Sequence, residues 1–342
     1  MDLSKYDHKI FTIEPGNFEP LALEIFRFQY NNNPVYHEYV DALKVNVPAI
    51  GAIAQIPFLP VRFFKSHAIM TTFFSPEVVF ESSGTTGSVV SRHIIKKTAL
   101  YETAFTRGFE LFYGPVKDWC IIGLLPSYLE RSNSSLVYMI YELIRQSGHA
   151  GSGFYLHDHD KLFTTLKNIE KEKQKTILIG VTFALLDFAE KFSLPFEHTI
   201  IMETGGMKGR REEMIRQEVH DILKRSFGLP AIHSEYGMTE LLSQAYSKGN
   251  GIFHCPPWMR VLIRDDEDPL SVQSGVRSPK SGAGNTKFGT LTGAINIIDL
   301  ANIYSCSFIA TDDAGRLYSD SSFEVLGRID NSDIRGCSLM IV

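Results

Sequence analysis

The chain has 342 residues, of which 44% are hydrophobic and 21% charged, and its formal net charge is −5. This balance is typical of a globular protein with a sizeable core, and it argues against a general affinity for nucleic acid or anionic membranes. The N-terminal residues lack a signal-peptide pattern, and apolar runs such as that from Trp119 are too short to span a bilayer. The four cysteines lie far apart without a CxxC pair, which argues against a disulfide framework and predicts a cytoplasmic protein.

In chain order, residues 1 to about 60 combine helical spacing with irregular stretches, and Pro57 and Pro60 mark an extended connector. A short strand at Glu77–Phe80 leads into a glycine-rich loop, and helical and strand patterns alternate beyond it. Helices are predicted near residues 97–113, 134–148, 161–175, 183–192 and 211–228, with Ser134 or Ser135 as the cap of the second and with Gly148 and Gly228 as helix ends. Strands are predicted near residues 119–125, 176–182, 198–206 and 230–237. This alternation predicts an α/β fold, with a largely parallel sheet flanked by helices.

From about residue 255 the pattern changes to short β-like runs separated by turn residues. It predicts a β-rich lobe, a distorted β-barrel, that contains a polar glycine-rich loop at 271–289. We therefore expect one large domain over residues 1–342, with an α/β part at 1–254 and the β-rich lobe at 255–342.

The loop "SSGTTGS", Ser82 to Ser88, combines two properties of a phosphate-binding loop. Its glycines allow backbone amides to approach an anion, and its hydroxyls can donate further hydrogen bonds. It lacks the Gly-Lys-Ser/Thr end of a Walker A loop. Taken alone, it is either a phosphate cradle or a strand-to-helix turn without a ligand.

Three later stretches carry side chains suited to a nucleotide. In "SEYGMTE" the ring of Tyr236 can stack on a base, and the carboxylate of Glu240 can hold Mg²⁺. In "ATDDAGRL" a carboxylate can accept hydrogen bonds from ribose hydroxyls, although such a stretch also suits a simple hairpin. Arg328 and Arg335 near the end are suited to phosphate, or are solvated surface arginines.

In this order, the four stretches resemble those of the adenylate-forming superfamily, which includes acyl-CoA synthetases and luciferases; the likeness runs from Pro57 to the end. It implies the fold of that superfamily's N-terminal domain, with ATP and Mg²⁺ as cofactors. It implies ATP contacts from Ser83, Gly84, Thr85, Thr86, Gly87, Ser88, Arg92, Gly205, Gly206, Tyr236, Gly237, Met238, Asp312 and Arg328. It also implies that Thr239 lies near the α-phosphate and that Glu240 positions Mg²⁺. Asp312 is the expected ribose ligand, with Asp313 as the alternative.

The superfamily normally continues for about a hundred residues after the hinge at "GRIDNSDIRG", and we expect that small C-terminal domain to be absent here. The chain is similar to a branch without it, the LuxE-type acyl-protein synthetases of fatty acid reductase complexes. The likeness includes "IPFLPVRFFK", Ile56 to Lys65, and the C-terminal "RGCSLM". It implies that Cys337 accepts the acyl group, whereas a cysteine judged alone is often only core packing.

The resemblance implies an ATP-dependent, AMP-forming acid–thiol ligase that activates a carboxylic acid, a fatty acid in that branch, as acyl-AMP. The acyl group would pass to a thiol such as that of Cys337, which is catalytic together with Glu240 and Thr239. The acid, with an acyl reductase or carrier protein, would be the partners. Two alternatives stay open: an enzyme like phenylacetate-CoA ligases, and a nucleotide-binding subunit without chemistry.

Overall fold

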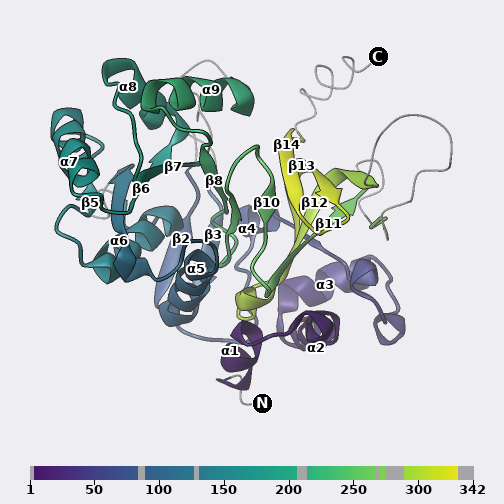
Figure 1. The fold of residues 1–342 in the computed structure, drawn as a ribbon. Helices are drawn as coiled ribbons and strands as arrows, with labels where there is room; N and C mark the ends of the chain where they lie inside the picture. The colour runs from purple at the N-terminus through teal and green to yellow at the C-terminus, as the bar shows by residue number, and fades with distance from the viewer. Residues whose placement is uncertain are drawn as a thin grey trace, which may run out of the picture.

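The protein is described by a computed structural model that covers residues 4–83, 89–126, 131–205, 214–265, 270–273 and 289–329 (Figure 1). The helices are α1 (Ser4–Phe11), α2 (Phe18–Asn32), α3 (Pro34–Ala42), α4 (Phe63–Ser66), α5 (Thr98–Tyr113), α6 (Ser135–Ser147), α7 (His159–Lys171), α8 (Thr182–Lys191) and α9 (Arg216–Phe227). The strands up to the middle of the chain are β1 (Leu59–Pro60), β2 (Val78–Glu81), β3 (Arg92–Ile95), β4 (Cys120–Leu124), β5 (Gly153–Phe154), β6 (Thr176–Val181) and β7 (Thr199–Thr204). The later strands are β8 (His233–Tyr236), β9 (Ala245–Ser247), β10 (Phe253–His254), β11 (Met259–Arg264), β12 (Thr290–Asp299), β13 (Phe308–Tyr318) and β14 (Phe323–Arg328).

The first half of the main sheet is parallel, in the order β5-β4-β6-β7-β8. Helices α6 to α9 provide the crossovers between these strands. Every residue of β4 and β6 is buried, because helices cover both faces of a parallel sheet and its strands become continuous apolar runs. The predicted α/β fold with a largely parallel sheet is therefore confirmed.

Local sequence signals mark the start of α6 and the ends of α6 and α9 where they were expected. The hydroxyl of Ser134 accepts a hydrogen bond from the backbone N–H of Val137 at the start of α6. Gly148 ends α6 and Gly228 ends α9, both with left-handed backbones (φ of 62° and 63°) that favour glycine. The predicted cap and both predicted helix ends are confirmed.

The sheet continues beyond β8 as antiparallel strands in the order β9-β10-β14-β13-β12-β11, so the β-rich lobe extends the same sheet (Figure 1). Strand β1 joins it by pairing in parallel with β13, with Leu59 opposite Ile309. Leu59 and Pro60, from the N-terminal part of the chain, are thereby part of this sheet. On the N-terminal side, Gln29 of α2 lies fully buried and donates to the carbonyls of Asn302 and Ile303.

The glycine-rich loop has a different setting from the one its sequence suggested. Strands β2 and β3 form a separate antiparallel pair, with Glu81 opposite Arg92. The loop therefore connects two strands of a hairpin. Of the two alternatives named from sequence, the strand-to-helix turn is wrong, because the extended run 92–95 intervenes before α5.

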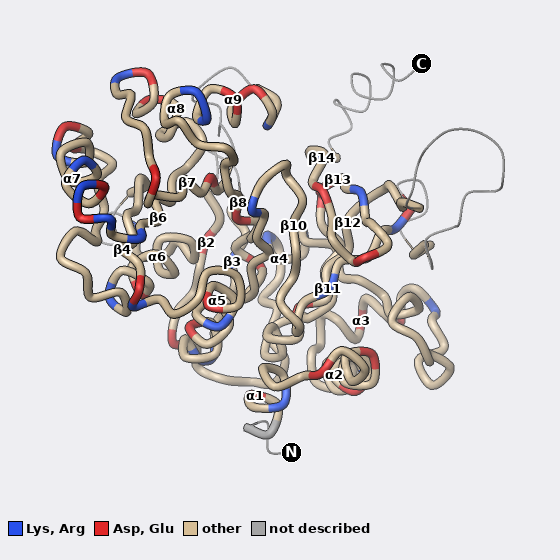
Figure 2. The backbone as a smooth tube through the Cα atoms, in the orientation of Figure 1, with Lys and Arg blue, Asp and Glu red and all other residues tan. Residues whose placement is uncertain are grey.

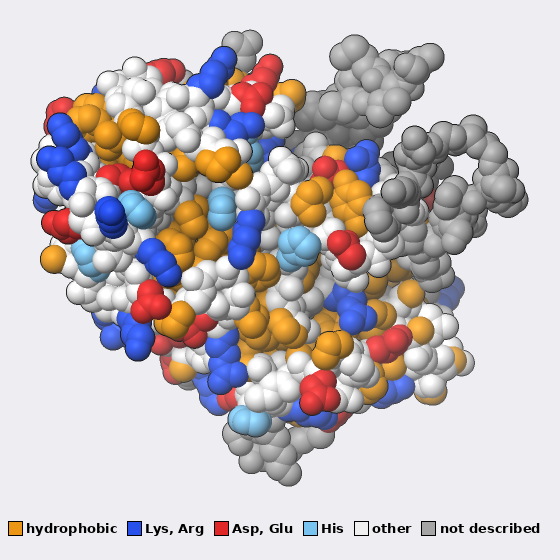
Figure 3. All heavy atoms as spheres, viewed as in Figure 1, with side chains coloured by type: hydrophobic (Ala, Val, Ile, Leu, Met, Phe, Trp, Pro, Cys, Tyr) orange, Lys and Arg blue, Asp and Glu red, His pale blue; other side chains and the backbone are white. Residues whose placement is uncertain are grey.

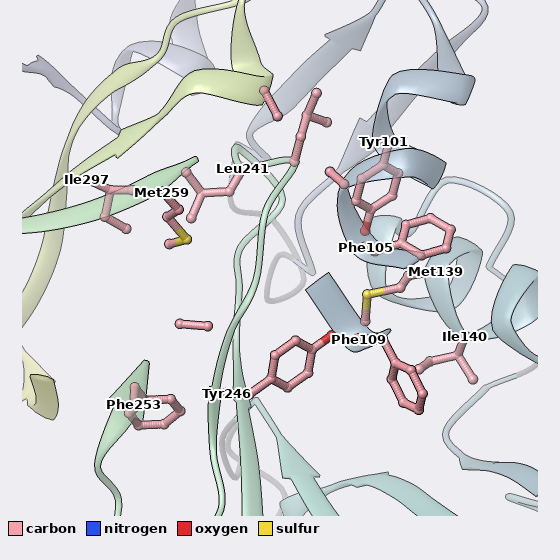
Figure 4. Packing of buried hydrophobic residues seen from close by; sticks show 14 of the residues in the cluster. Tyr101, Phe105, Phe109, Met139, Ile140, Leu241, Tyr246, Phe253, Met259 and Ile297 are labelled. Carbon is pink, nitrogen blue, oxygen red and sulfur yellow. The ribbon is translucent and has the colours of Figure 1, made fainter. Parts of the chain in front are cut away.

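Aromatic side chains fill the space between α5, α6 and the sheet. Figure 4 shows Tyr101, Phe105 and Phe109 of α5 packed near Met139 of α6 and Tyr246 of β9. All five are at most 2% exposed. Much of the high phenylalanine content, 24 residues, is thus accounted for by core packing, because 22 of them are at most 9% exposed or packed against the core.

The surface carries both signs of charge. Figure 2 shows basic and acidic residues interspersed along α7 and α9, and the face in Figure 3 shows the same mixture among hydrophobic and histidine side chains. Among the helices described, none combines the length and apolar character that crossing a bilayer would require.

Candidate nucleotide site

The base of the glycine-rich loop is closed by hydrogen bonds between Ser82 and Ser91. The N–H of Ser82 donates to the carbonyl of Ser91 at 3.0 Å, and the N–H of Ser91 donates to the hydroxyl of Ser82 at 2.9 Å. Ser83 and Arg92 are both exposed. The predicted phosphate ligands Gly84, Thr85, Thr86, Gly87 and Ser88 lie outside the described residues.

His93 links this hairpin to the Tyr236–Glu240 segment. Its buried ring lies 2.7 Å (Nδ1) from the carbonyl oxygen of Thr239 and 2.9 Å (Nε2) from Oδ1 of Asn302. Asn302 in turn donates through Nδ2 to the carbonyl of Glu240 at 2.7 Å. Burial lowers the pKa of His93 to about 4, although these two hydrogen bonds offset part of the effect. The network fixes Thr239 and Glu240 against the base of the loop.

Glu240 is 6% exposed and carries the carboxylate expected to hold Mg²⁺. Burial raises its pKa above the ordinary value, and a hydrogen bond from Ser91 and the positive charges of Arg328 and Lys65 partly counter this. Mg²⁺ in nucleotide sites uses one or two carboxylates together with substrate phosphates. The carboxylate of Glu240 and the hydroxyl of Ser91, which converge from two segments, fit that requirement. Among the described residues, no group of three or more metal-binding side chains occurs.

Tyr236, Asp313 and Arg328 meet at the start of the Tyr236–Glu240 segment. The hydroxyl of Tyr236 donates to Oδ2 of Asp313 at 2.8 Å, and Nε of Arg328 lies 3.8 Å from Oδ1 of the same carboxylate. The Tyr236 ring packs edge-on against Phe253 and Phe323, with centroids 5.9 and 5.6 Å away. Burial raises the pKa of Asp313, while Tyr236 and Arg328 lower it. The three side chains brought together here come from β8, β13 and β14.

Asp312, the expected ribose ligand, has a different neighbour. Its Oδ2 accepts a hydrogen bond from Nε of Arg62 at 3.0 Å, and its backbone carbonyl accepts from Ile329 at 2.7 Å. It is Asp313 that faces Tyr236 and Arg328, so the alternative named from sequence is the carboxylate in this cluster. Neither Arg62 nor Asn302 stood out as a site residue from sequence; the only signal was the place of Arg62 in "IPFLPVRFFK".

The "ETGG" stretch ends β7 beside the same segment, with Glu203 of β7 opposite Ser234 of β8. Gly205 has φ +71°, a backbone that favours glycine, and its carbonyl accepts a hydrogen bond from the hydroxyl of Thr182 at 3.0 Å. Glu203 is buried and accepts from the hydroxyls of Thr182 and Ser234, each at 3.1 Å. Its side chain also lies 3.4 Å from the ring of His220, and these contacts fix the end of the strand.

Other expected residues have more limited contacts. Gly237 follows Tyr236, and a Cβ there would require the Glu235 carboxyl to shift. Met238 packs as a partly buried side chain against the core, and its carbonyl accepts from the N–H of Leu241. Gly206 and Cys337 lie outside the described residues.

Comparison with known proteins gives the family. The model of the LuxE acyl-protein synthetase family matches residues 16–342. No curated protein sequence is similar enough to count as a match.

Two solved structures share the fold. A chimera of RpMatB and BxBclM with bound ATP has a TM-score of 0.53 at 16% identity, covering 75% of this chain and 50% of its own. ATP-bound MatB from Rhodopseudomonas palustris has a TM-score of 0.51 at 16% identity, with the same coverage of both chains. The chain thus spans about half the length of these proteins, and the likeness confirms the expected fold. Because the family model matches nearly the whole chain, this protein belongs to the LuxE acyl-protein synthetase family.

Proposed function

We propose that the protein is an ATP-dependent ligase that converts a carboxylic acid into an acyl-adenylate and transfers the acyl group to a thiol. The observation that carries the proposal is the convergence of Tyr236, Asp313 and Arg328 with Thr239 and Glu240 beside the Ser82–Ser91 loop base. Tyr236 suits the base, Asp313 suits the ribose, and Thr239, Glu240 and Arg328 suit the polyphosphate with its metal ion. Family membership supports an acyl-protein synthetase, and the two solved structures compared above are described as binding ATP.

In the proposed first step, an oxygen of the acid attacks the α-phosphorus of ATP, and the bond to pyrophosphate breaks. Asp313 would accept hydrogen bonds from ribose hydroxyls, with Tyr236 holding its carboxylate and stacking against the base. Thr239 and the loop around Ser83 would donate to the phosphates, and Arg328 would stabilise charge. Glu240 and Ser91 would hold Mg²⁺, which neutralises phosphate charge when bound. Catalysis would rest on positioning and charge.

In the proposed second step, the Cys337 thiolate attacks the acyl carbonyl carbon, the thioester forms, and AMP leaves with the electron pair of the broken C–O bond. The thiol proton passes to solvent. This assignment rests on sequence, because Cys337 lies outside the described residues. Coenzyme A or a carrier protein is the alternative thiol, and an acyl reductase the proposed later recipient. We propose a fatty acid as the substrate, in keeping with the acyl-protein synthetase family.

ATP–pyrophosphate exchange with a panel of carboxylic acids tests the first step. We expect exchange only when an acid is present, with the best acids among long-chain fatty acids. Nucleotide binding without exchange for any acid would instead support a binding subunit without chemistry.

Labelled fatty acid and ATP test the second step separately. We expect a protein-bound label that hydroxylamine releases, and that is lost in Cys337→Ser while exchange activity persists. A hydroxylamine-sensitive label that survives in Cys337→Ser would place the thioester elsewhere.

A further inference from the structure

The short helix α4 lies between the two ends of the candidate nucleotide site. The N–H of Val61 donates to the carbonyl of Ala310 at 2.9 Å, directly after the β1–β13 pairing. Phe64 is fully buried, and its ring packs edge-on against His93, the residue that holds Thr239. The segment 61–66 is therefore anchored both to the strand that carries Asp312 and to the hairpin beside Glu240.

This segment carries two basic residues, Arg62 and Lys65. Arg62 precedes α4 and has a helical backbone conformation. Because Arg62 and Lys65 are three residues apart, they lie on the same side of this helical turn. Arg62 lies 3.0 Å from the carboxylate of Asp312. Lys65 is exposed, and it directly follows Phe64, whose ring packs against the His93 that contacts the carbonyl of Thr239 beside Glu240.

The charges around the site give these residues a role. Asp312, Asp313 and Glu240 bring three carboxylates to a place where a polyphosphate is proposed to bind, and like charges repel strongly where solvent is limited. Arg328 lies beside Asp313, and its charge also acts on Glu240. The α4 segment adds two cations, Arg62 beside Asp312 and Lys65 next to the Phe64–His93 contact that adjoins the Thr239–Glu240 segment.

We propose that α4 is a wall of the nucleotide site, with Lys65 as a direct contact to the β- and γ-phosphates and Arg62 as a positioning residue for the Asp312–Asp313 strand. This inference rests on the proposed function and adds to it a phosphate ligand from the N-terminal segment. A lysine here acts as a mobile point charge, which suits a polyphosphate, while the planar guanidinium of Arg62 suits a fixed carboxylate. Lys65 then contributes to the affinity for ATP but not to the affinity for AMP, whereas Arg62 contributes to both.

Calorimetric titration of the full chain with MgATP and, separately, with AMP tests the proposal. For Lys65→Met we expect MgATP binding to weaken about 10-fold and AMP binding to change less than 2-fold, because only ATP carries the β- and γ-phosphates. The loss should shrink as KCl is raised, since salt screens the charge interaction. Lys65→Arg, which keeps the charge, should recover most of the affinity.

Two further variants complete the test. Lys171→Met removes an exposed lysine from α7, remote in the chain from the site, and should leave both affinities unchanged. Arg62→Gln should weaken ATP and AMP equally. If the wild-type protein binds neither nucleotide, the proposed function fails and this inference fails with it. If the wild type binds both and Lys65→Met binds MgATP as Lys171→Met does, only the inference is overturned.

Discussion

Glu235 offers a sharp test of the electrostatics beside the site, because it is a buried carboxyl whose charge has little compensation. It lies at the end of β8, directly before Tyr236, and accepts a hydrogen bond from the hydroxyl of Thr204. Burial raises its pKa from the ordinary 4.5 to about 7, although the Thr204 hydroxyl pulls it down. Glu235→Gln removes the charge, keeps the shape and leaves an oxygen for Thr204.

The sign and size of the effect follow from linkage. Between pH 4.5 and about 7 the folded protein keeps a proton on Glu235 that the unfolded chain releases, so wild-type stability falls as pH rises through this range. The difference between the two pKa values corresponds to about 3 kcal/mol in the free energy of unfolding. Glu235→Gln should therefore match the wild type near pH 4.5 and exceed its stability by up to about 3 kcal/mol at pH 8.

Urea unfolding of both proteins between pH 5 and 8, followed by tryptophan fluorescence, measures the difference. Taking the difference cancels the titration of all other groups that the two proteins share. Glu38→Gln, which removes an exposed charge from α3, is the control and should show no such trend. A difference between Glu235→Gln and the wild type that stays constant from pH 5 to pH 8 would refute the reasoning.

Three further predictions address the site and the strands that support it. Asp313→Asn should weaken MgATP binding about 10- to 100-fold through lost charge-assisted hydrogen bonds, and Asp312→Asn clearly less; equal losses in titrations would contradict the assignment. Arg264→Met should lower the free energy of unfolding by about 3–5 kcal/mol in urea, because the buried guanidinium donates to three oxygen acceptors; a loss below 1 kcal/mol would contradict this. Gly315→Ala should lower the free energy of unfolding by about 1–3 kcal/mol, since its Cβ would lie 2.5 Å from the side chain of Ile295. An unchanged thermal midpoint of unfolding would count against that packing.

Much of the fold could be predicted because its signals are local. The alternation of apolar runs with amphipathic stretches indicated the parallel strands, and Ser134, Gly148 and Gly228 marked helix ends through their own backbone chemistry. The order of the motifs also indicated the fold and the family, because several weak signals in a fixed order exclude most alternatives.

The parts that sequence did not predict depend on distant partners. Whether Asp312 or Asp313 faces Tyr236 is decided by the side-chain alternation of β13 against β14, where the register shifts between Ala314 and Gly315. The pairing of β2 with β3 needed a partner strand that lies beyond the glycine-rich loop. The contact between Arg62 and Asp312 spans 250 residues, and no local pattern encodes it.

The central claim is that this chain forms an acyl-adenylate, and the most direct measurement is detection of that compound. The protein is incubated with ATP, Mg²⁺ and a long-chain fatty acid, quenched, and the extract is examined by mass spectrometry. We predict an acyl-AMP of the expected mass with the wild type and with Cys337→Ser, and a strongly reduced amount with Asp313→Asn. ATP binding without any acyl-AMP, across a panel of aliphatic and aromatic acids, would contradict the account.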